Sequence, residues 1–323
     1  MRRLAALSAI LALTAAAFAL PQGAATDGIV LVRQGRYREA KPILERAVKA
    51  DPKDAAAWRA LGIVHNDFDL DFEKAAAALD KAVALEGRNA ESHYQLGYAY
   101  ARIALNASRL RQIGLAAKVK RQGLKTIELD PRHIEARKGM IQFYMAAPGI
   151  MGGSKEKARE QAAEVSRLDP YQGELAWALI ASAEHNNAEL EKRYTAALSL
   201  NPDGWEALLN FGAFCIRRNR TDEALTMLER AAALRPDDPR SHESLGDVLA
   251  AKGRDAEALR SYGTALALRP NFDPVVFKLA RYHERKGDTV RAADYYSRYL
   301  TLVKTGRRAG QARTKLRQWG KAA

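Results

Sequence analysis

The side chains that most often carry out chemistry are few and widely spaced in this chain. Its six histidines show no His-Glu-x-x-His pattern, and Cys215 is the only cysteine. Zinc sites are usually built from closely spaced pairs of Cys or His, so we expect none here. Cys215 lies between Phe214 and Ile216. We interpret it as a small buried apolar residue, because an activated thiol needs a positively charged neighbourhood.

An acidic run that is similar to the start of a calcium-binding loop comprises Asp67, Asp69, Asp71 and Glu73. A calcium loop of this type also needs a central glycine and a glutamate that binds with both oxygens. The glycine is missing, and Ala78 stands where the glutamate belongs. The run therefore predicts a solvated turn and no calcium site.

A glycine-rich segment at residues 148–154 has the wrong order of residues for a phosphate-binding loop. Such loops carry Gly-Lys-Ser/Thr after a strand, whereas Gly153, Ser154 and Lys155 follow an expected helix. We expect Ser154 to cap the helix that begins there. The alternative is an anion held at that helix N-terminus.

No set of residues with catalytic spacing is recognisable. Ser154 and Lys157, with the run 304–306, match two motifs of penicillin-binding enzymes, but the third motif, Ser-Asp-Asn, is absent. We therefore expect a non-enzymatic protein with no catalytic residues, no cofactor and no metal ion. The alternative is an enzyme whose site is assembled only by the fold.

The composition favours helices as the elements that position these residues. The 323-residue chain is rich in Ala and Leu, and only 7% of its residues are aromatic. Ala and Leu lose little conformational freedom in a helix. The expected fold class is therefore all-α.

An internal repeat of about 34 residues is the clearest pattern in the sequence. One copy is marked by Leu208, Phe211, Gly212, Cys215, Ala224, Leu228, Ala231 and Pro236. The next is marked by His242, Leu245, Gly246, Leu249, Ala258, Tyr262, Ala265 and Pro270. This pattern resembles the tetratricopeptide repeat, a pair of antiparallel helices. Gly212 and Gly246 would let the two helices of a unit approach closely.

The resemblance implies a right-handed superhelical α-solenoid of about eight helix pairs. We place its units at residues 26–54, 55–88, 89–132, 133–170, 171–202, 203–236, 237–270 and 271–304. Most of these units close with a proline such as Pro170, which should stop the second helix. Such short helices are unstable alone, so neighbouring pairs must stack. Residues 305–323 are expected to form a basic capping helix, or alternatively a membrane-surface helix.

Residues 1–25 have the pattern of a secretory signal peptide. Arg2 and Arg3 precede an apolar run from Leu4 to Leu20, and small residues follow it. As a helix this run would be about 25 Å long, shorter than the ~30 Å hydrocarbon core of a membrane. We therefore expect a periplasmic or secreted protein, with an uncleaved N-terminal membrane anchor as the alternative.

The resemblance also implies that the first helices of successive units line a concave groove. The residues expected to face it are Arg59, Tyr94, Tyr98, Arg102, Lys138, Gln142, Trp177, Arg217, Glu243, Asp247, Phe277 and Arg281. Rings and mixed charges suit an extended peptide or a partner helix. Glu243 and Asp247 would put negative charge into the C-terminal part, so we do not expect the Lys/Asn clamp for C-terminal carboxylates. The alternative is an ordinary solvated face.

Positive charge is concentrated in two regions. The net charge is +14; residues 285–323 carry eleven Lys or Arg against two Asp, and residues 92–127 carry seven and no acidic residue. The expected basic surface comprises Lys118, Lys120, Arg121, Arg308, Arg313, Lys315 and Arg317. Such clusters attract anionic partners through fields that salt weakens. Nucleic acid is not expected, because no nucleic-acid-binding motif accompanies the charge.

These patterns predict a scaffold or adaptor of the periplasm or cell envelope that binds a protein or peptide partner in its groove. The competing interpretation is a protein that binds an anionic envelope surface, lipid or polysaccharide, through the basic clusters.

Overall fold

The computed structural model describes residues 24–321, and these form helices without any β-strand. The signal peptide expected at residues 1–25 falls almost entirely outside the described residues. The chain divides into two compact units, Met1–Ile103 and Ala104–Ala323. Within residues 24–321, no helix is both long enough and apolar enough to cross a membrane.

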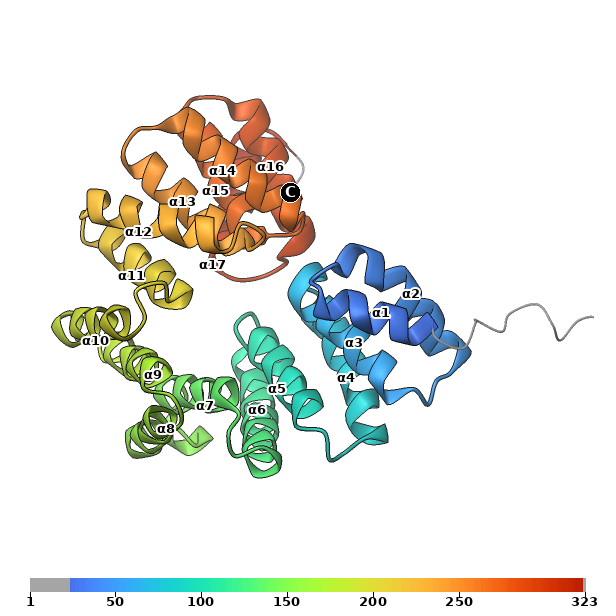
Figure 1. The fold of residues 1–323 in the computed structure, drawn as a ribbon. Coiled ribbons are helices and arrows are strands. Elements are labelled where there is room, and N and C mark those ends of the chain that lie inside the picture. Colours follow the sequence, from blue (N-terminus) through green and yellow to red (C-terminus); the bar gives the residue numbers. More distant parts are fainter. Residues whose placement is uncertain (1–23, 322–323) are drawn as a thin grey trace, which may run out of the picture. The chain divides into compact units, whose positions relative to one another are not determined.

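The first unit is a run of short helices with a shared apolar interior. The elements are α1 (Ala24–Arg33), α2 (Tyr37–Ala50), α3 (Ala55–Val64), the π-helical turn η1 (His65–Asp69), α4 (Phe72–Leu85) and α5 (Ala90–Ala104) (Figure 1). Leu44 of α2 and Val64 of α3 are fully buried in this interior. The hydroxyl of Tyr100 on α5 donates to Asp80 on α4 at 2.8 Å, which fixes α5 against its predecessor.

The second unit contains more helices than the first, and most of them form consecutive pairs. Its helices are α6 (Arg109–Leu129), α7 (Ile134–Ala146), α8 (Lys155–Leu168), α9 (Pro170–Ala183), α10 (Asn187–Leu200), α11 (Trp205–Arg217), α12 (Thr221–Leu234), α13 (Pro239–Ala251), α14 (Asp255–Leu268), α15 (Asp273–Arg285), α16 (Thr289–Leu302) and α17 (Arg307–Gln318) (Figure 1). A short 3-10 turn, η2 (Gly149–Met151), precedes α8.

The helices from α1 to α16 follow one another as eight pairs, and α17 ends the described chain. The expected all-α solenoid of helix pairs is thereby confirmed. The pair expected at residues 89–132 is divided, because α5 belongs to the first unit and α6 to the second. The first turns of α6 lack buried residues, and Leu110 is 84% exposed, so little within the second unit holds them.

The turn between the two helices of a pair recurs in one backbone conformation. His185, Asn219, Gly253 and Gly287 have φ of 56°, 59°, 73° and 74° respectively. Neighbours in this series are 34 residues apart in sequence. The left-handed region ends a helix sharply and frees the chain to reverse direction. Glycine adopts it without strain, whereas His185 must accept close contacts between its Cβ and the backbone.

The two crossing glycines accommodate a large side chain from the partner helix. A Cβ atom on Gly212 would lie 2.7 Å from Cγ of Leu228, and one on Gly246 would lie 2.5 Å from the ring of Tyr262. The expectation of close approach is confirmed at both positions. In each pair, one large side chain of the second helix fills the space above the glycine: Leu228 above Gly212, and Tyr262 above Gly246.

From the sequence, Pro170 was expected to close the second helix of its repeat. The structure shows that this expectation is wrong. Helix α8 ends at Leu168, and Pro170 is the first residue of α9. Proline is suited to this position because its nitrogen needs no hydrogen-bond acceptor there. The carboxylate of Asp169 caps the same helix by accepting from the backbone N–H of Gln172.

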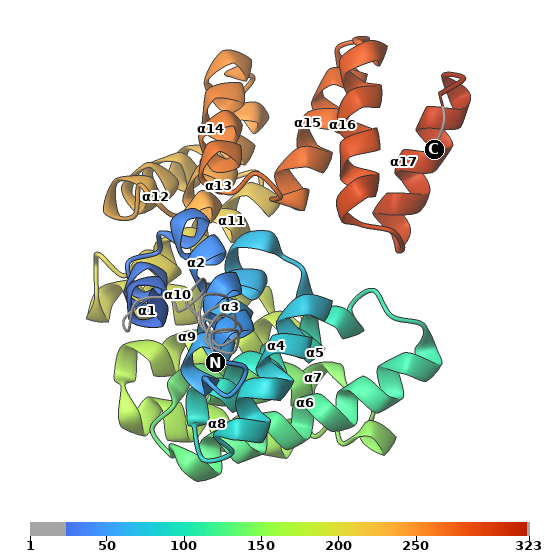
Figure 2. The ribbon, with the colours of Figure 1, turned by 90° about the vertical axis from the view of Figure 1, so that its right-hand side faces the viewer.

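The expected capping helix at the C-terminal end is confirmed. Ala309, Ala312 and Leu316 are fully buried on one side of α17. They pack with Tyr296 and Tyr299 of α16, and Figure 2 shows α17 beside that helix. The apolar stripe of α17 is thus used to cover the last repeat.

Candidate functional site

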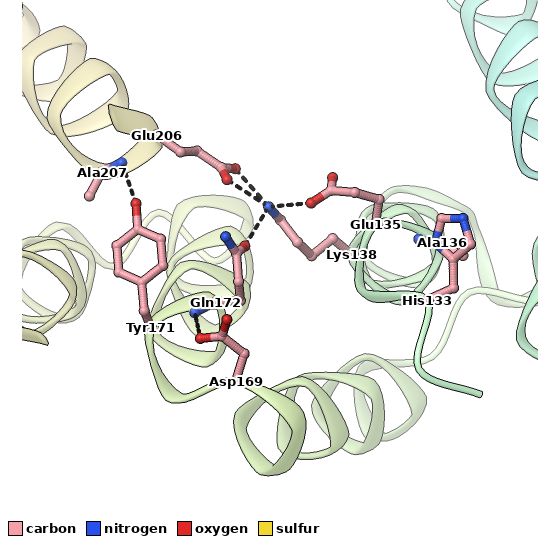
Figure 3. A network of polar contacts seen from close by, with 9 residues as sticks. All are labelled: His133, Glu135, Ala136, Lys138, Asp169, Tyr171, Gln172, Glu206 and Ala207. Carbon is pink, nitrogen blue, oxygen red and sulfur yellow. Dashed lines mark hydrogen bonds and ion pairs between the residues drawn. The ribbon is translucent and has the colours of Figure 1, made fainter. Parts of the chain in front are cut away.

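Three successive first helices meet at the ammonium group of Lys138. Lys138 lies on α7, Gln172 on α9 and Glu206 on α11, each 34 residues after the last (Figure 3). The Nζ atom of Lys138 lies 2.7 Å from Glu206 Oε1 and 3.1 Å from both Gln172 Oε1 and Glu135 Oε1. Only 6% of Lys138 is exposed. Equivalent positions of three repeats therefore form one polar network.

The backbone around this network is held by side-chain caps. Asp169 Oδ1 accepts from the backbone N–H of Gln172 at 3.0 Å, and His133 Nδ1 accepts from that of Ala136 at 3.2 Å (Figure 3). The hydroxyl of Tyr171 accepts from the backbone N–H of Ala207 at 3.2 Å and so links α9 to α11. The helices that carry the network are thus fixed at their first turns.

The charge of Lys138 is retained in spite of its burial. Burial lowers the pKa of Lys138, but the carboxylates of Glu206 and Glu135 outweigh it and hold the pKa above its usual value. One ammonium faces two carboxylates, so the network has a net negative charge. Lys138, expected to contact a partner, is instead bonded within the chain.

A second polar cluster joins the last two pairs, α13 with α14 and α15 with α16. Lys278 on α15 donates to Glu243 Oε1 at 2.7 Å and to Asp247 Oδ2 at 2.5 Å. Tyr262 on α14 donates to the other oxygen of Asp247 at 2.7 Å. Burial raises the pKa of Glu243, an effect that Lys278 only partly offsets. Lys278 balances one of these two carboxylates, so the negative charge expected from Glu243 and Asp247 in this part of the groove is reduced but not removed.

An open hollow lies beside this cluster. Its volume is about 560 Å³, and residues of α13, α15 and α17 make most of its wall. Arg281 is exposed at its edge, whereas Phe277 is only 6% exposed. The Phe277 ring packs 5.0 Å from that of Tyr299, and the guanidinium of Arg308 lies 5.4 Å above it. The expected aromatic anchor is therefore largely enclosed.

The expected binding residues of the first unit form two small groups. Arg59 pairs with Glu86, which also accepts from the hydroxyl of Ser92 at 2.7 Å. The guanidinium of Arg102 lies 4.4 Å above the ring of Phe72 and donates to the hydroxyl of Tyr98 at 2.9 Å. Tyr94 is half-buried on the same helix as Tyr98.

The remaining expected groove residues in the second unit are not brought together. Gln142 and Arg217 are exposed on α7 and α11. Trp177 contacts the two adjacent helices, α8 and α10. Its indole N–H donates to Ser166 of α8 at 3.2 Å, and the guanidinium of Arg193 of α10 lies 5.5 Å above the ring. Trp177 thus contributes to packing between α8, α9 and α10.

Part of the expected basic surface is already engaged. Lys315 pairs with Glu284 at 2.8 Å, and Arg313 donates to the backbone carbonyl of Lys304 at 2.5 Å. Arg317 and Arg308 are exposed on α17. On α6, Lys118 and Arg121 are exposed and Lys120 is half-buried.

The acidic run near residue 69 is not a solvated turn. Asp69 Oδ2 lies 2.6 Å from Nδ1 of the buried His65 and 2.7 Å from Nζ of Lys41. Burial opposes ionisation of Asp69, but these hydrogen bonds outweigh it and hold its pKa below the usual value. Asp71 caps α4, so two of the acidic residues stabilise the fold.

Other candidates have structural roles. Ser154 accepts from the backbone N–H of Lys157, so the expected helix cap is confirmed. Cys215 is buried as expected, and burial raises the pKa of its thiol. Among residues 24–321, no group of three or more His, Cys, Asp or Glu side chains could hold a metal ion.

The sequence interpretation missed Gln172, Glu206 and Lys278. A signal existed for the first two, since they follow Lys138 at intervals of 34 residues. Lys278 follows Phe277 directly but was given no role. The repeat spacing thus predicts which residues occupy equivalent positions. It does not predict which of their side chains form hydrogen bonds or ion pairs.

Comparisons with known proteins agree with the fold of repeated helix pairs. The family model described as "Tetratricopeptide repeat" matches residues 27–68, 175–239, 216–274 and 256–312. The chain is 24% identical over 220 residues to the peroxisomal targeting signal receptor of Saccharomyces cerevisiae, covering 68% of this chain and 35% of that protein. A chain in the crystal structure of the APC/C hetero-tetramer Cut9-Hcn1 has a similar fold, with a TM-score of 0.51 and 13% identity over 90% of this chain. The match spans 55% of that solved chain.

Proposed function

Because this chain belongs to the tetratricopeptide repeat family, a family of protein-interaction scaffolds, we propose that it is a non-enzymatic adaptor that holds a peptide or partner helix against its first helices. The first-helix surface means the face of α7, α9, α11, α13 and α15 that carries Lys138, Gln142, Gln172, Glu206, Arg217, Glu243, Asp247, Lys278 and Arg281.

The observation that carries the proposal is that polar side chains of neighbouring first helices bond to one another in two places. Lys138 on α7 donates both to Gln172 on α9 and to Glu206 on α11, which follow it by 34 and 68 residues. Lys278 of α15 likewise reaches two carboxylates of α13. A surface with a fixed register across repeats can hold an extended or helical partner along its length.

The named relatives support a protein or peptide as the partner. The yeast relative is named as a receptor for a targeting signal, and the solved relative belongs to a hetero-tetramer. This chain spans 35% of the yeast protein, so the partner need not be of the same kind.

Site-specific photo-crosslinking tests the proposal. A photoreactive amino acid at Gln142 or Arg281, both exposed on first helices, should crosslink a partner protein in cells of the source organism. The matched controls are Lys192 and Arg291 on second helices, whose side chains are 72% and 70% exposed. Crosslinks at the control positions and none at Gln142 or Arg281 would show that the first helices are not the binding surface.

We also propose export to the periplasm or cell envelope. The support is the pattern of residues 1–25, in which paired arginines precede an apolar run. Cell fractionation and the intact mass of the purified protein test this. A cytoplasmic protein of full-length mass would contradict export, and a full-length membrane-bound protein would indicate the uncleaved anchor.

A second candidate function is attachment to an anionic envelope surface through α6. The supporting observation is that Lys118 and Arg121 are exposed on α6, within residues 92–127, which contain no acidic residue. Such attachment should weaken steeply as ionic strength rises to physiological levels. Crosslinking at Gln142 should change little over the same range.

A further inference from the structure

The hollow in the second unit combines apolar walls with a cationic rim. Its apolar lining comes from Ile216, Ala250, Ala251, Phe277 and Tyr282. Its volume of about 560 Å³ lies within the range of ligand-binding pockets. The site therefore has room for a few side chains of a bound molecule.

Four arginines line the hollow: Arg281, Arg285, Arg307 and Arg308. All four are exposed, and none forms an ion pair with a carboxylate of residues 24–321. Asp247 is the acidic residue in the lining, and it already accepts from Lys278 and Tyr262. The rim thus carries positive charge that no direct ion pair within the described chain neutralises.

Several other arginines of the second unit form ion pairs with carboxylates. Arg193 bonds with Glu174 and Glu189, Arg220 bonds with Glu191 and Glu223, and Arg254 bonds with Glu257. Several like charges around one hollow repel each other unless a counter-charge is present. The hollow is therefore suited to an anion from outside the chain.

We propose that this hollow binds an acidic segment of a protein partner, with carboxylates on the arginines and an apolar or aromatic side chain against Phe277 and Tyr282. The inference rests on the proposed function, because it gives the chemistry of the partner at one end of the first-helix surface. Guanidinium groups match carboxylates with two parallel hydrogen bonds. Arg308 is already oriented by the ring of Phe277 at 5.4 Å.

A peptide suits this site better than a membrane surface. The arginines surround a concave space with rings and small apolar residues in its wall, and a flat bilayer reaches such a space poorly. Exposed cations on a helix, such as Lys118 and Arg121, suit a flat anionic surface better. The hollow is therefore assigned to a protein segment.

Fluorescence anisotropy with a labelled peptide in which Glu and Phe alternate tests the assignment. The matched peptide has Gln in place of every Glu. The parent protein should bind the Glu peptide about tenfold or more tightly than the Gln peptide, because each charge-assisted hydrogen bond contributes strongly. The double variant Arg281→Gln with Arg285→Gln should lose about tenfold in affinity for the Glu peptide.

The control double variant, Arg260→Gln with Arg291→Gln, removes the same charge from α14 and α16 and should bind like the parent. A second pair on α17, Arg307→Gln with Arg308→Gln, should repeat the loss, and circular dichroism verifies that each variant is folded. Equal binding of the Glu and Gln peptides, or equal losses in the hollow and control variants, would overturn the inference.

Three further outcomes separate this inference from others. If phosphatidylglycerol vesicles lose affinity for the Arg281/Arg285 variant while the peptide does not, the hollow binds a membrane and the assignment is wrong. If crosslinks at Gln142 persist in a protein that fails to bind the Glu peptide, only this inference fails. If neither Gln142 nor Arg281 crosslinks a partner, the proposed function itself fails, whatever the peptide does.

Discussion

The Nζ atom of Lys138 lies 2.7 Å from Oε1 of Glu206, although 68 residues separate them in sequence. The distance is short because both residues occupy the same position of the repeat, two units apart. Gln172 occupies that position in the unit between them and also accepts from Lys138. Stacking of helix pairs therefore converts a sequence interval into a line of adjacent side chains. This line is the structural basis of the proposed binding surface.

Replacement of Lys138 by methionine should destabilise the second unit. Glu206 and Glu135 would lose a buried counter-charge, and we expect the free energy of unfolding to fall by about 1–3 kcal/mol. Urea denaturation measures the change. The control Lys125→Met removes an exposed pair with Glu128 and should change stability by less than about 0.5 kcal/mol. Equal effects of both variants would mean that the network contributes no more than a surface pair.

Two glycines of one helix pair should respond in opposite directions to alanine. Gly246→Ala places a Cβ atom 2.5 Å from the ring of Tyr262, so we expect destabilisation. Gly263→Ala on α14 has no atom within 4 Å of its new Cβ, and we expect stabilisation by about 0.5–1 kcal/mol. Thermal unfolding of both variants checks this. Stabilisation by Gly246→Ala would contradict the close packing of α13 on α14.

Replacement of His185 by glycine should stabilise the turn between α9 and α10. His185 has φ of 56°, and a residue with a Cβ atom is strained there by about 1 kcal/mol, partly offset by the greater entropy of glycine in the unfolded chain. We expect a small rise in the urea midpoint. The reverse change at the equivalent turn, Gly253→Ala, should lower it. Movement of both variants in one direction would rule out the strain argument.

The acid stability of the first unit should depend on Asp69. Its pKa is lowered in the folded state by His65 and Lys41, so its contribution is fully present above the unfolded value of about 3.9. The contribution is lost as the pH falls through the lower folded pKa. The difference in urea midpoint between the parent and Asp69→Asn should therefore shrink as the pH falls below about 4. A difference that grows in acid would contradict this sign.

Much of the fold could be predicted from the sequence because its determinants are local and periodic. The spacing of Gly212 and Gly246, the caps and the closing residues together set helix lengths and pairing. Pro170 was assigned to the wrong helix because proline suits both the end of one helix and the first turn of the next. The division between α5 and α6 depends on tertiary packing, which the repeat pattern does not encode.

The candidate site could be predicted only as a set of positions. The register placed Lys138, Glu243 and Arg281 on first helices, but it could not show that Lys138 and Glu243 are bonded within the chain. Such bonds depend on the reach of side chains across neighbouring repeats. Arg281 remains unpaired among the described residues, and it now marks the edge of the hollow.

Hydrogen–deuterium exchange with a bound partner tests the central claim most directly. The partner isolated by crosslinking would be added to the uncrosslinked protein, and amide protection would be compared helix by helix. We predict slower exchange in α7, α9, α11, α13 and α15, with little change in the second helices of the same pairs. Protection confined to the second helices or to α6 would contradict the claim that the first helices hold the partner.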